Sequence, residues 1–507
     1  MPRHPSFHPP ARAACGQAGF ATGARPLLRT LGAAGLLALS ACVNLAPETQ
    51  TPALPVADAW PADAQAEPQA AIARALRDLD WSHYFEDADM RRLIGLALEH
   101  NRDLRLAALR VREAEAAYRI QRADLLPSVG AQGQAERGRT PGDLNLSGQP
   151  QIQSRYQASI GLSDWELDFW GRIRNLKDAA LDDWLATDAA RQAVQVALVR
   201  QVADSVLALR ELDQRAFLAD EAVRNRQRSL DIFQQRTAVG SSSELELTQV
   251  RTLLIQAESL QVRLRQERAA AAHALTLLTG TDPGPAPTRS VDLDTTGLTR
   301  LEPGLPSEVL LARPDIRAAE YQLRAAHARI GAARAAFLPR IALTSGIGSA
   351  SAELDGLFES GSKAWTFAPV ISIPIFTAGR LQANLDVAEV RRDMAVATYE
   401  RSIQTAFREV ADALSARQGL AEQLDVQIRM ARTQAARAEL AQLRYDSGAA
   451  PYLEVLDAQR DLLNAQQQLV EIRRAWLSSQ VALYAALGGG AGRPLDTPST
   501  LTAPHAS

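Results

Sequence analysis

The sequence predicts a mixed α and β membrane protein that is built from two internal repeats. Two helical tracts, 172–239 and 380–446, each continue for about 67 residues with hardly a helix breaker. Four shorter runs alternate between apolar and small or polar residues, which is the period of a β-strand. Residues of the first half also recur in the second half at an offset of 208–212, which indicates a duplicated unit.

The composition favours long helices packed on helices over a large globular core. Aromatic residues make up only 5% of the 507 residues, and Ala, Leu, Arg and Gln dominate the helical tracts. The formal net charge is −3, and no basic stripe stands out along the chain. Nothing in the sequence therefore indicates nucleic acid as a partner, and none is predicted.

Residues 1–41 are predicted to be a lipoprotein signal peptide. Arg25 and Arg29 precede an apolar run that is too short to span a membrane as a stable helix. The run ends in Leu-Ser-Ala before Cys42, and small residues before a cysteine resemble the lipobox of bacterial lipoproteins. Cys42 is expected to become the acylated N-terminus, while Cys15 is removed. Val43 in place of Asp favours the outer membrane. An ordinary secretory signal with a chance cysteine is the alternative.

The remaining chain divides by composition and periodicity. Apolar residues recur at helical spacing over 81–100, namely at Met90, Leu93, Ile94, Ala97 and Leu98. This helix is expected to run on from Asp103 to Leu126. The predicted segments are a lipidated, Pro- and Ala-rich tether at 42–80, a first repeat at 81–282, an equatorial linker at 283–307, a second repeat at 308–490 and a C-terminal tail at 491–507.

The repeat is visible residue by residue. Asp103 lies 24 residues before Pro127, and Asp315 lies 24 residues before Pro339. Further pairs keep an offset of 208, namely Gly171 and Gly379, Gly240 and Gly448, Leu245 and Leu453, Glu246 and Glu454, and Gly280 and Gly488. Each repeat is therefore predicted to contain a helix, two strands and two long helices. Gly419 is the main interruption of the second long tract.

The four strands are predicted from alternation. In the first repeat the alternating apolar or small residues are Val129, Ala131, Gly133 and Ala135, and then Tyr156, Ala158, Ile160 and Leu162. The phase changes at Trp165, which indicates a bulge or the end of the strand. In the second repeat they are Ile341, Leu343 and Ile347, and then Trp365, Phe367, Ile371, Ile373 and Ile375.

Runs of this length suit tilted membrane strands, although a soluble two-sided sheet would alternate in the same way. An open four-stranded sheet cannot lie in lipid, because the hydrogen-bonding groups of its edges would be unsatisfied. A membrane barrel must then be shared between chains, and three chains would give twelve strands. The sequence alone does not give the copy number.

The stretch Tyr445–Arg460 is predicted to be a tight turn between two long helices. Gly448 and Pro451 break the helical pattern. Leu453, Glu454 and Asp457 then follow at helical spacing on neighbouring parts of one face. Acidic residues in the first turns of a helix favour its N-terminal dipole, so simple helix capping explains them. The alternative is that they belong to a channel gate.

Catalytic and metal-binding motifs are missing from the sequence. There is no nucleotide-binding loop, no HExxH and no Cys/His ligand spacing, and the histidines of the mature chain are scattered. Neither enzyme activity nor a cofactor is predicted.

Several stretches together resemble the outer-membrane factors of tripartite efflux systems, the TolC-like channels, and within them the lipoprotein branch similar to OprM and NodT. These stretches are LSAC at 39–42, the first helix from Trp81, DWELDFWGR at 164–172, ARPDIRAAEYQLRAAHARIGAARAAFLPRIALT at 312–344, ISIPIFTAGRL at 371–381, and AFREVADAL at 406–414. The resemblance extends from Cys42 to about Pro494.

The resemblance implies a homotrimer with a twelve-stranded barrel in the outer membrane and a helical tunnel across the periplasm. An inner-membrane transporter of the resistance-nodulation-division class would load the tunnel through a periplasmic adaptor protein. The channel would be a passive conduit for drugs or toxic compounds. The alternatives are the outer-membrane channel of a type I protein-secretion system, which shares the fold, and a lipid-anchored coiled-coil protein without a pore.

The resemblance also implies a periplasmic gate at the second turn. Leu453 and Asp457 would point into the lumen, with Arg460 three residues after the acid. Tyr445 matches a tyrosine that helps to hold related channels closed, and Glu454 matches the second acidic ring of some relatives. The counterparts in the first repeat, Leu245, Glu246 and Gln249, share the spacing but lack an acid at 249. Adaptor contacts are expected at the Gly240 and Gly448 turns.

Overall fold

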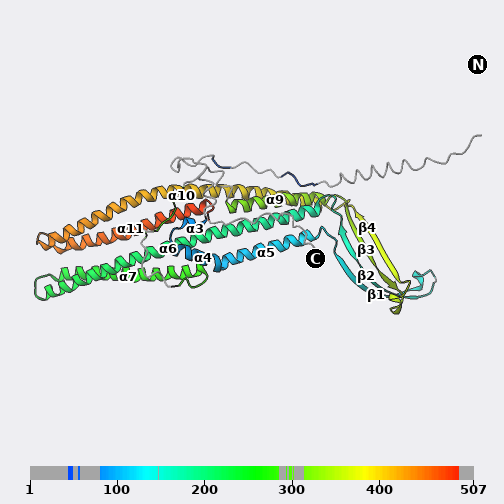
Figure 1. Cartoon of the computed structure of the whole chain (residues 1–507), viewed down its shortest axis with the longest axis horizontal. Helices are drawn as coiled ribbons and strands as arrows, with labels where there is room; N and C mark the ends of the chain where they lie inside the picture. The colour runs from blue at the N-terminus through cyan, green and yellow to red at the C-terminus, as the bar shows by residue number, and fades with distance from the viewer. Residues whose placement is uncertain are drawn as a thin grey trace, which may run out of the picture.

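The protein is an elongated molecule in which a β-sheet at one end continues into long helices (Figure 1). The structure is a computed structural model, and it describes residues 44–48, 55–57, 80–146, 148–284, 293, 296–299, 301 and 313–489. The predicted signal peptide with Cys15, the lipidation site Cys42 and the predicted C-terminal tail lie outside these residues. The two helical hairpins end at the opposite pole from the sheet.

The first helical region is broken into three helices, α3 (Trp81–Tyr84), α4 (Ala88–His100) and α5 (Arg102–Ala123). The prediction that one helix runs on past residue 100 is wrong at Asn101. This residue is extended, and its side chain accepts a hydrogen bond from the backbone N–H of Leu104 at 2.9 Å. An N-cap of this kind begins a new helix and changes its direction. Most of the predicted apolar stripe of α4 is buried, as expected for its inner face.

The sheet has four antiparallel strands in the order β1-β2-β3-β4. They are β1 (Val129–Thr140), β2 (Gln151–Glu166), β3 (Arg340–Ser351) and β4 (Lys363–Ser372). The central pairing, in which Ile160 lies opposite Ile347, joins the two repeats. The register of β2 shifts between Leu162 and Trp165, so the predicted change of phase is a bulge.

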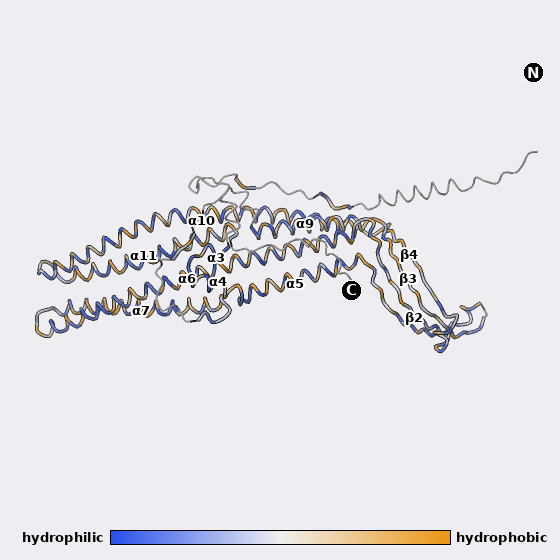
Figure 2. The backbone as a smooth tube through the Cα atoms, in the orientation of Figure 1, coloured by the Kyte–Doolittle hydropathy of each residue, from blue (hydrophilic) through white to orange (hydrophobic). Residues whose placement is uncertain are grey.

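The strands carry large apolar side chains that the single chain leaves exposed, such as Ile160, Ile347, Trp365 and Phe367. Hydrophobic residues recur along the strands as well as along the helices (Figure 2). The prediction for β4 was too long, because Ile373 and Ile375 lie beyond its end. β3 begins at Arg340, which pairs with Ser372, and no residue of β3 remains to pair with those that follow.

Two helical hairpins form the rest of the molecule. The first consists of α6 (Arg172–Ala238) and α7 (Glu244–Thr279), and the second of α10 (Arg380–Asp446) and α11 (Tyr452–Ala486). The shorter helix α9 (Pro314–Ala335) packs against α6 and α10. Both α6 and α10 contain 67 residues, and Gly419 does not interrupt α10. No helix in the described part of the chain is apolar for long enough to cross a membrane.

The largest buried cluster lies at mid-length, where α3 and α4 pack against α6, α10 and α11. The rings of Tyr84 and Tyr484 stack there with their centroids 4.1 Å apart. Beside them, Arg210 of α6 forms a buried ion pair with Asp87 at 2.9 Å. The Asp87 side chain also caps α4. This core fixes the hairpins relative to one another between the sheet and the turns.

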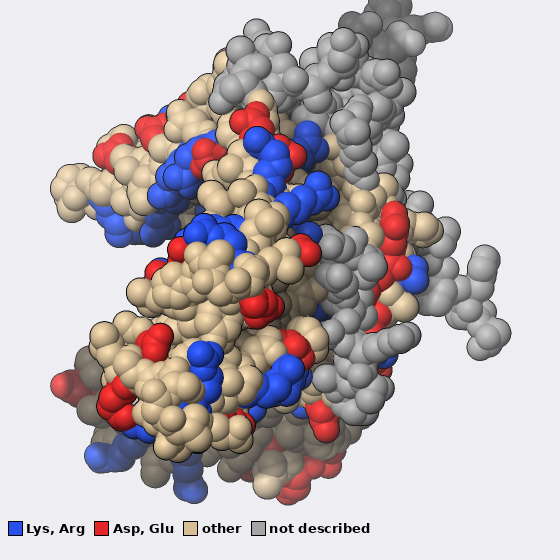
Figure 3. Space-filling view, turned by 90° about the vertical axis from the view of Figure 1, so that its left-hand side faces the viewer, with Lys and Arg blue, Asp and Glu red and all other residues tan. Residues whose placement is uncertain are grey.

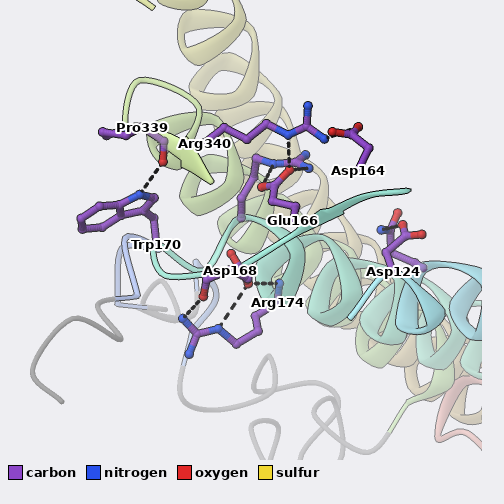
Figure 4. Close-up of polar contacts among 10 residues, drawn as sticks. Asp124, Asp164, Glu166, Asp168, Trp170, Arg174, Pro339 and Arg340 are labelled. Atoms are coloured by element: carbon purple, nitrogen blue, oxygen red, sulfur yellow. Dashed lines mark hydrogen bonds and ion pairs between the residues drawn. The ribbon is translucent and has the colours of Figure 1, made fainter. Parts of the chain in front are cut away.

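Glu166, the last residue of β2, fastens the sheet to the helices (Figure 4). Arg172, at the start of α6, donates to both of its carboxylate oxygens at 2.8 and 2.7 Å. Arg340, at the start of β3, donates to Glu166 and to Asp164, in each case at 2.8 Å. Bidentate pairs between arginine and carboxylate fix orientation as well as adding energy. The first turn of α6 is therefore held firmly on the strand before it.

A second set of contacts braces the same junction (Figure 4). The indole N–H of Trp170 donates to the carbonyl oxygen of Pro339 at 2.8 Å. Asp168 accepts from the backbone N–H of Arg174 at 2.8 Å, and an acid at this position favours the N-terminal dipole of α6. Together the two sets connect both repeats at the boundary of sheet and helices.

Candidate channel gate

The two hairpin turns have the same backbone. Gly240 and Gly448 have φ of 74° and 76°, which only glycine adopts without strain. The N–H of Ser241 donates to the carbonyl of Arg236 at 2.8 Å, and the N–H of Ala449 donates to that of Arg444 at the same distance. Both turns are thus Schellman motifs, which satisfy the free carbonyls at a helix end.

The first turn is closed by its own residues. Ser243 caps α7 by accepting from the N–H of Glu246 at 3.2 Å, and Glu246 accepts in return from the N–H of Ser243 at 2.9 Å. This is a capping box. The hydrogen bond from the Ser243 backbone lowers the pKa of Glu246. Leu245 is exposed and Gln249 is half-buried on the same helix.

The second turn leaves its acids free for other partners. Pro451 is the N-cap of α11 and offers no side-chain cap. Glu454, at the position of Glu246, lies instead 3.5 Å from Arg444 of α10. The predicted gate residues share one face of α11, where Leu453 is 45% exposed and the Asp457 carboxylate lies 3.1 Å from Arg460.

The ion pairs continue along α11 and across to α10. Arg460 also lies 3.3 Å from Asp461, and Asp461 accepts from Arg437 of α10 at 2.7 Å. The hydrogen bond from Arg437 lowers the pKa of Asp461. These side chains are between about a third and a half exposed, so each pair contributes only about 0.2–1 kcal/mol. The network orients the charges of this face more than it holds the helices together.

An aromatic cluster connects the two hairpins behind this charged face. The ring of Tyr452 lies 4.6 Å from that of Phe233 on α6 and 4.8 Å from that of Tyr445 on α10. The Tyr452 hydroxyl lies 2.7 Å from Ser229, and Arg236 donates to the Tyr445 hydroxyl. Burial raises the pKa of Tyr452. Tyr445 therefore contacts Tyr452 of its own repeat and Arg236 of the other repeat.

The sequence did not single out the partners of Tyr445. Phe233 and Arg236 lie three residues apart on α6, which is the spacing of neighbours on one helix face. Tyr452 directly follows Pro451, so its side chain belongs to the first turn of α11. These were the available signals, but neither identifies a contact between helices that lie 200 residues apart in sequence.

A buried arginine lies in the first hairpin near the charged face of α11. Arg226 of α6 is 5% exposed and donates to the carbonyl oxygen of Leu253 on α7 at 2.8 Å. Burial lowers its pKa, and the nearby charge of Arg460 lowers it further. The positive charge of Arg460 therefore acts on the buried Arg226, while Arg460 itself pairs with Asp457 and Asp461.

Seen toward the turns, the surface is hollowed on one side between the two hairpins, and basic and acidic side chains lie together around it (Figure 3). Within the described residues, no three His, Cys, Asp or Glu side chains are grouped so as to hold a metal ion. The site is therefore a face of α11 that carries charged side chains and one exposed leucine.

An edge-paired sheet of four strands that continues into helices of 67 residues defines a class of protein, the outer-membrane channels with a helical tunnel. The chain belongs to the outer membrane efflux protein family, whose sequence model it matches over 93–281 and 305–489. Members of this family are channels, so the prediction that the protein is not an enzyme is confirmed by its family.

Similar proteins agree with this assignment. The chain is 46% identical over 459 residues to the solvent efflux pump outer membrane protein SrpC of Pseudomonas putida, covering 90% of this chain and 97% of that protein. It is 42% identical over 455 residues to the outer membrane protein OprJ of Pseudomonas aeruginosa, covering 90% and 94%.

Solved structures give the same result. A crystal structure of a membrane protein from Pseudomonas aeruginosa superimposes with a TM-score of 0.81 at 39% identity, and covers 88% of this chain and 100% of the other. The open state of the Neisseria gonorrhoeae MtrE outer membrane channel superimposes with a TM-score of 0.80 at 34% identity, covering 90% and 100%.

The predicted fold class and function are confirmed. The protein is an outer-membrane efflux channel with the fold of the trimeric channels, in which each chain supplies four strands to a shared barrel. It acts as the exit duct of an efflux pump. The coiled-coil alternative without a pore is excluded by the family, and the names of the relatives favour efflux over protein secretion.

Proposed function

We propose that this channel receives small, toxic organic compounds from an inner-membrane transporter of the resistance-nodulation-division class through a periplasmic adaptor. The relatives support this proposal, since they include a solvent efflux pump protein and a toluene efflux pump protein of Pseudomonas putida. The channel has no energy source of its own, so the pump selects and drives the substrate. An N-terminal lipid at Cys42 would anchor each chain to the outer membrane beside its barrel strands.

The second turn is the proposed gate. In a trimer, three copies of Asp457 near the symmetry axis would repel one another and attract cations, while three copies of Leu453 would form an apolar plug. Arg460 limits the repulsion, because it lies 3.1 Å from Asp457 within each chain. Glu454 is tied to Arg444, so it contributes a weaker second ring. The observation that carries this proposal is the exposed stripe of Leu453, Asp457 and Arg460 at the free end of the tunnel.

In this proposal, opening requires α11 to move away from the axis, and two kinds of contact at the second turn would resist that motion. The ion pairs of the charged face are half-exposed and weak. The buried contact of Tyr452 with Phe233 and the half-buried contact of Arg236 with Tyr445 hold the second hairpin on the first. Aromatic pairs contribute about 0.5–1.5 kcal/mol beyond their buried area. The aromatic cluster is therefore the proposed latch, and the charged face is the proposed filter.

Adaptor contacts are proposed at both turns, near Gly240 and Gly448. A groove between α10 and α11 at the second turn supports this, and it combines exposed leucines with charged side chains. Its residues include Arg437, Leu440, Leu443, Arg444 and Glu454. An adaptor that binds here would compete for the charge of Arg444 and so loosen Glu454. Leu245 and Gln249 of the first turn are proposed as packing and docking partners without a gating role.

Single-channel conductance in planar bilayers tests the gate. Asp457→Ala and Leu453→Ala should each raise the conductance of the closed trimer severalfold, because one removes the charge and the other the plug. Gln249→Ala and Leu245→Ala, at the matching positions of the first turn, are the controls and should conduct like the wild type. Wild-type conductance in both second-turn variants would refute the gate. Co-purification of the trimer with a pump and an adaptor tests the partners.

A further inference from the structure

The first described residues of the chain, 44–48, lie against the start of α6 and the end of α9, close to the sheet (Figure 1). The side-chain amide of Asn175 on α6 donates to the side-chain oxygen of Asn44 at 2.9 Å. The same oxygen accepts from the backbone N–H of Ala46 at 3.0 Å, so Asn44 forms a local turn. Asn175 is 2% exposed, which means that a buried amide of the helix is committed to this segment.

Gly331 of α9 provides the space for the segment. A Cβ at this position would lie 2.8 Å from the backbone N and from the Cα of Ala46, and 2.6 Å from the amide nitrogen of Asn175. Contacts under 3.0 Å are essentially never made by real Cβ atoms, so the backbone of Ala46 fits only against glycine. Arg334, one turn further along α9, lies 3.5 Å from the carbonyl oxygen of Leu45.

We propose that Asn175, Gly331 and Arg334 form a seat for the chain's own residues 44–46, and that this seat fixes where the anchored N-terminus leaves the channel. The second part rests on the proposed lipid at Cys42. Asn44 lies two positions after Cys42, which limits the distance between them to about 7 Å. Asn175 follows three residues after Arg172, at the junction of sheet and helices. The acyl chains then enter the membrane at the periplasmic rim of the barrel.

The seat changes the reach of the anchor. The next described contact of the segment with the body of the protein is Val56, which packs against the central core. Without the seat, the free tether would extend from Cys42 to Val56, which is about fourteen residues and a reach of about 50 Å. With the seat, the free part shrinks to two residues. The lipid would then be held at the rim of the barrel instead of at the end of a long free tether.

Spin-label mobility at the exposed residue Glu48 tests the seat in the full trimer. Glu48→Cys provides a site for the label, and the spectrum should show an immobile side chain. Gly331→Ala fills the seat, and Asn44→Ala removes the acceptor of both hydrogen bonds. Gly95→Ala on α4 is the matched control, because the nearest atom to its new Cβ is a carbon of Trp81 at 3.9 Å, an ordinary contact.

The immobile component should be lost in Gly331→Ala and in Asn44→Ala, and retained in Gly95→Ala, with trimer and conductance unchanged in all three. An immobile label in both seat variants would overturn the proposal. Mass spectrometry of the N-terminal peptide reports acylation of Cys42 in the same samples. An unacylated Cys42 beside an immobile label would remove the anchor and leave the seat. Absence of conductance in the wild-type trimer would instead refute the proposed channel function and would leave the seat unaffected.

Discussion

The two hairpin turns share one backbone but are fastened in different ways. At both turns a glycine in the left-handed region closes a Schellman motif, and the next helix starts at the equivalent residue. The third residue of that helix is glutamate in both cases. In the first turn Glu246 completes a capping box with Ser243, whereas in the second turn Glu454 faces Arg444 on the other helix.

This difference determines how far each turn is coupled to the rest of the tunnel. The capping box of the first turn is local, so it stabilises α7 without involving another hairpin. Pro451 removes that option from the second turn. Its stability depends on Tyr452, Phe233 and Arg236, which join α11 and α10 to α6. A duplicated motif has thus kept its fold while exchanging local for long-range contacts, and the proposed gate residues lie at the turn where the contacts are long-range.

Tyr452→Ala should have the largest effect on this contrast. Removing a buried aromatic side chain costs about 3–5 kcal/mol, and Tyr452 is 8% exposed between α6 and α10. Hydrogen exchange should accelerate at the ends of α6, α10 and α11 together, and the closed channel should leak. Glu244→Ala, at the same helix position in the first turn, is the control and should change neither. Exchange confined to α11 would contradict the long-range fastening.

Ser243→Ala should have a moderate and local effect. Loss of an N-cap costs about 0.5–2 kcal/mol, and only the first turns of α7 should exchange faster.

The capping box should also depend on pH. The folded state lowers the pKa of Glu246, so this stabilisation is present above its ordinary value of 4.5 and is lost as the pH falls through the lower folded value. Glu246→Gln should remove this acid sensitivity of α7. For the Ser243→Ala variant, a rate of hydrogen exchange in α7 equal to that of the wild type would show that the first turn is not held by its cap.

Glu454→Gln should have the smallest effect. The Glu454 carboxylate lies 3.5 Å from Arg444 and the pair is about half exposed, so it contributes only about 0.2–1 kcal/mol to stability. The difference from wild type in the exchange of the second turn should vanish in about 1 M salt, where charges are screened within about 3 Å. A difference that persists at high salt would show that Glu454 acts through packing rather than charge.

Much of the fold was predictable because its signals are periodic and long. The two helices of 67 residues, the four strands and the offset of 208 each follow from repeated local patterns. Even the bulge in β2 was visible, as a change of alternation phase at Trp165. Asn101 was missed, because an N-cap inside an apolar pattern interrupts the backbone without interrupting the stripe.

Gly419 was overestimated for the opposite reason. A single glycine lowers helix stability by only about 1 kcal/mol, which the packing of a long helix easily offsets. The positions of Leu453, Glu454 and Asp457 on neighbouring parts of one face could be predicted from spacing, whereas Arg460 was identified from the family resemblance. The contacts of the aromatic cluster could not be predicted, because Arg236 reaches Tyr445 and Phe233 reaches the neighbouring Tyr452 through tertiary packing across the repeats.

Because α6 and α10 are unbroken over 67 residues, a rotation at the turns can be distributed along the whole length of the tunnel. The junction at Glu166 clamps one end, and the turns are free at the other. A twist of about 20° at the turns, spread over a helix about 100 Å long, needs only about 0.3° per residue, far below the ordinary scatter of helical dihedrals. Such a channel needs no hinge residue, and its barrel can stay still while the far end rotates.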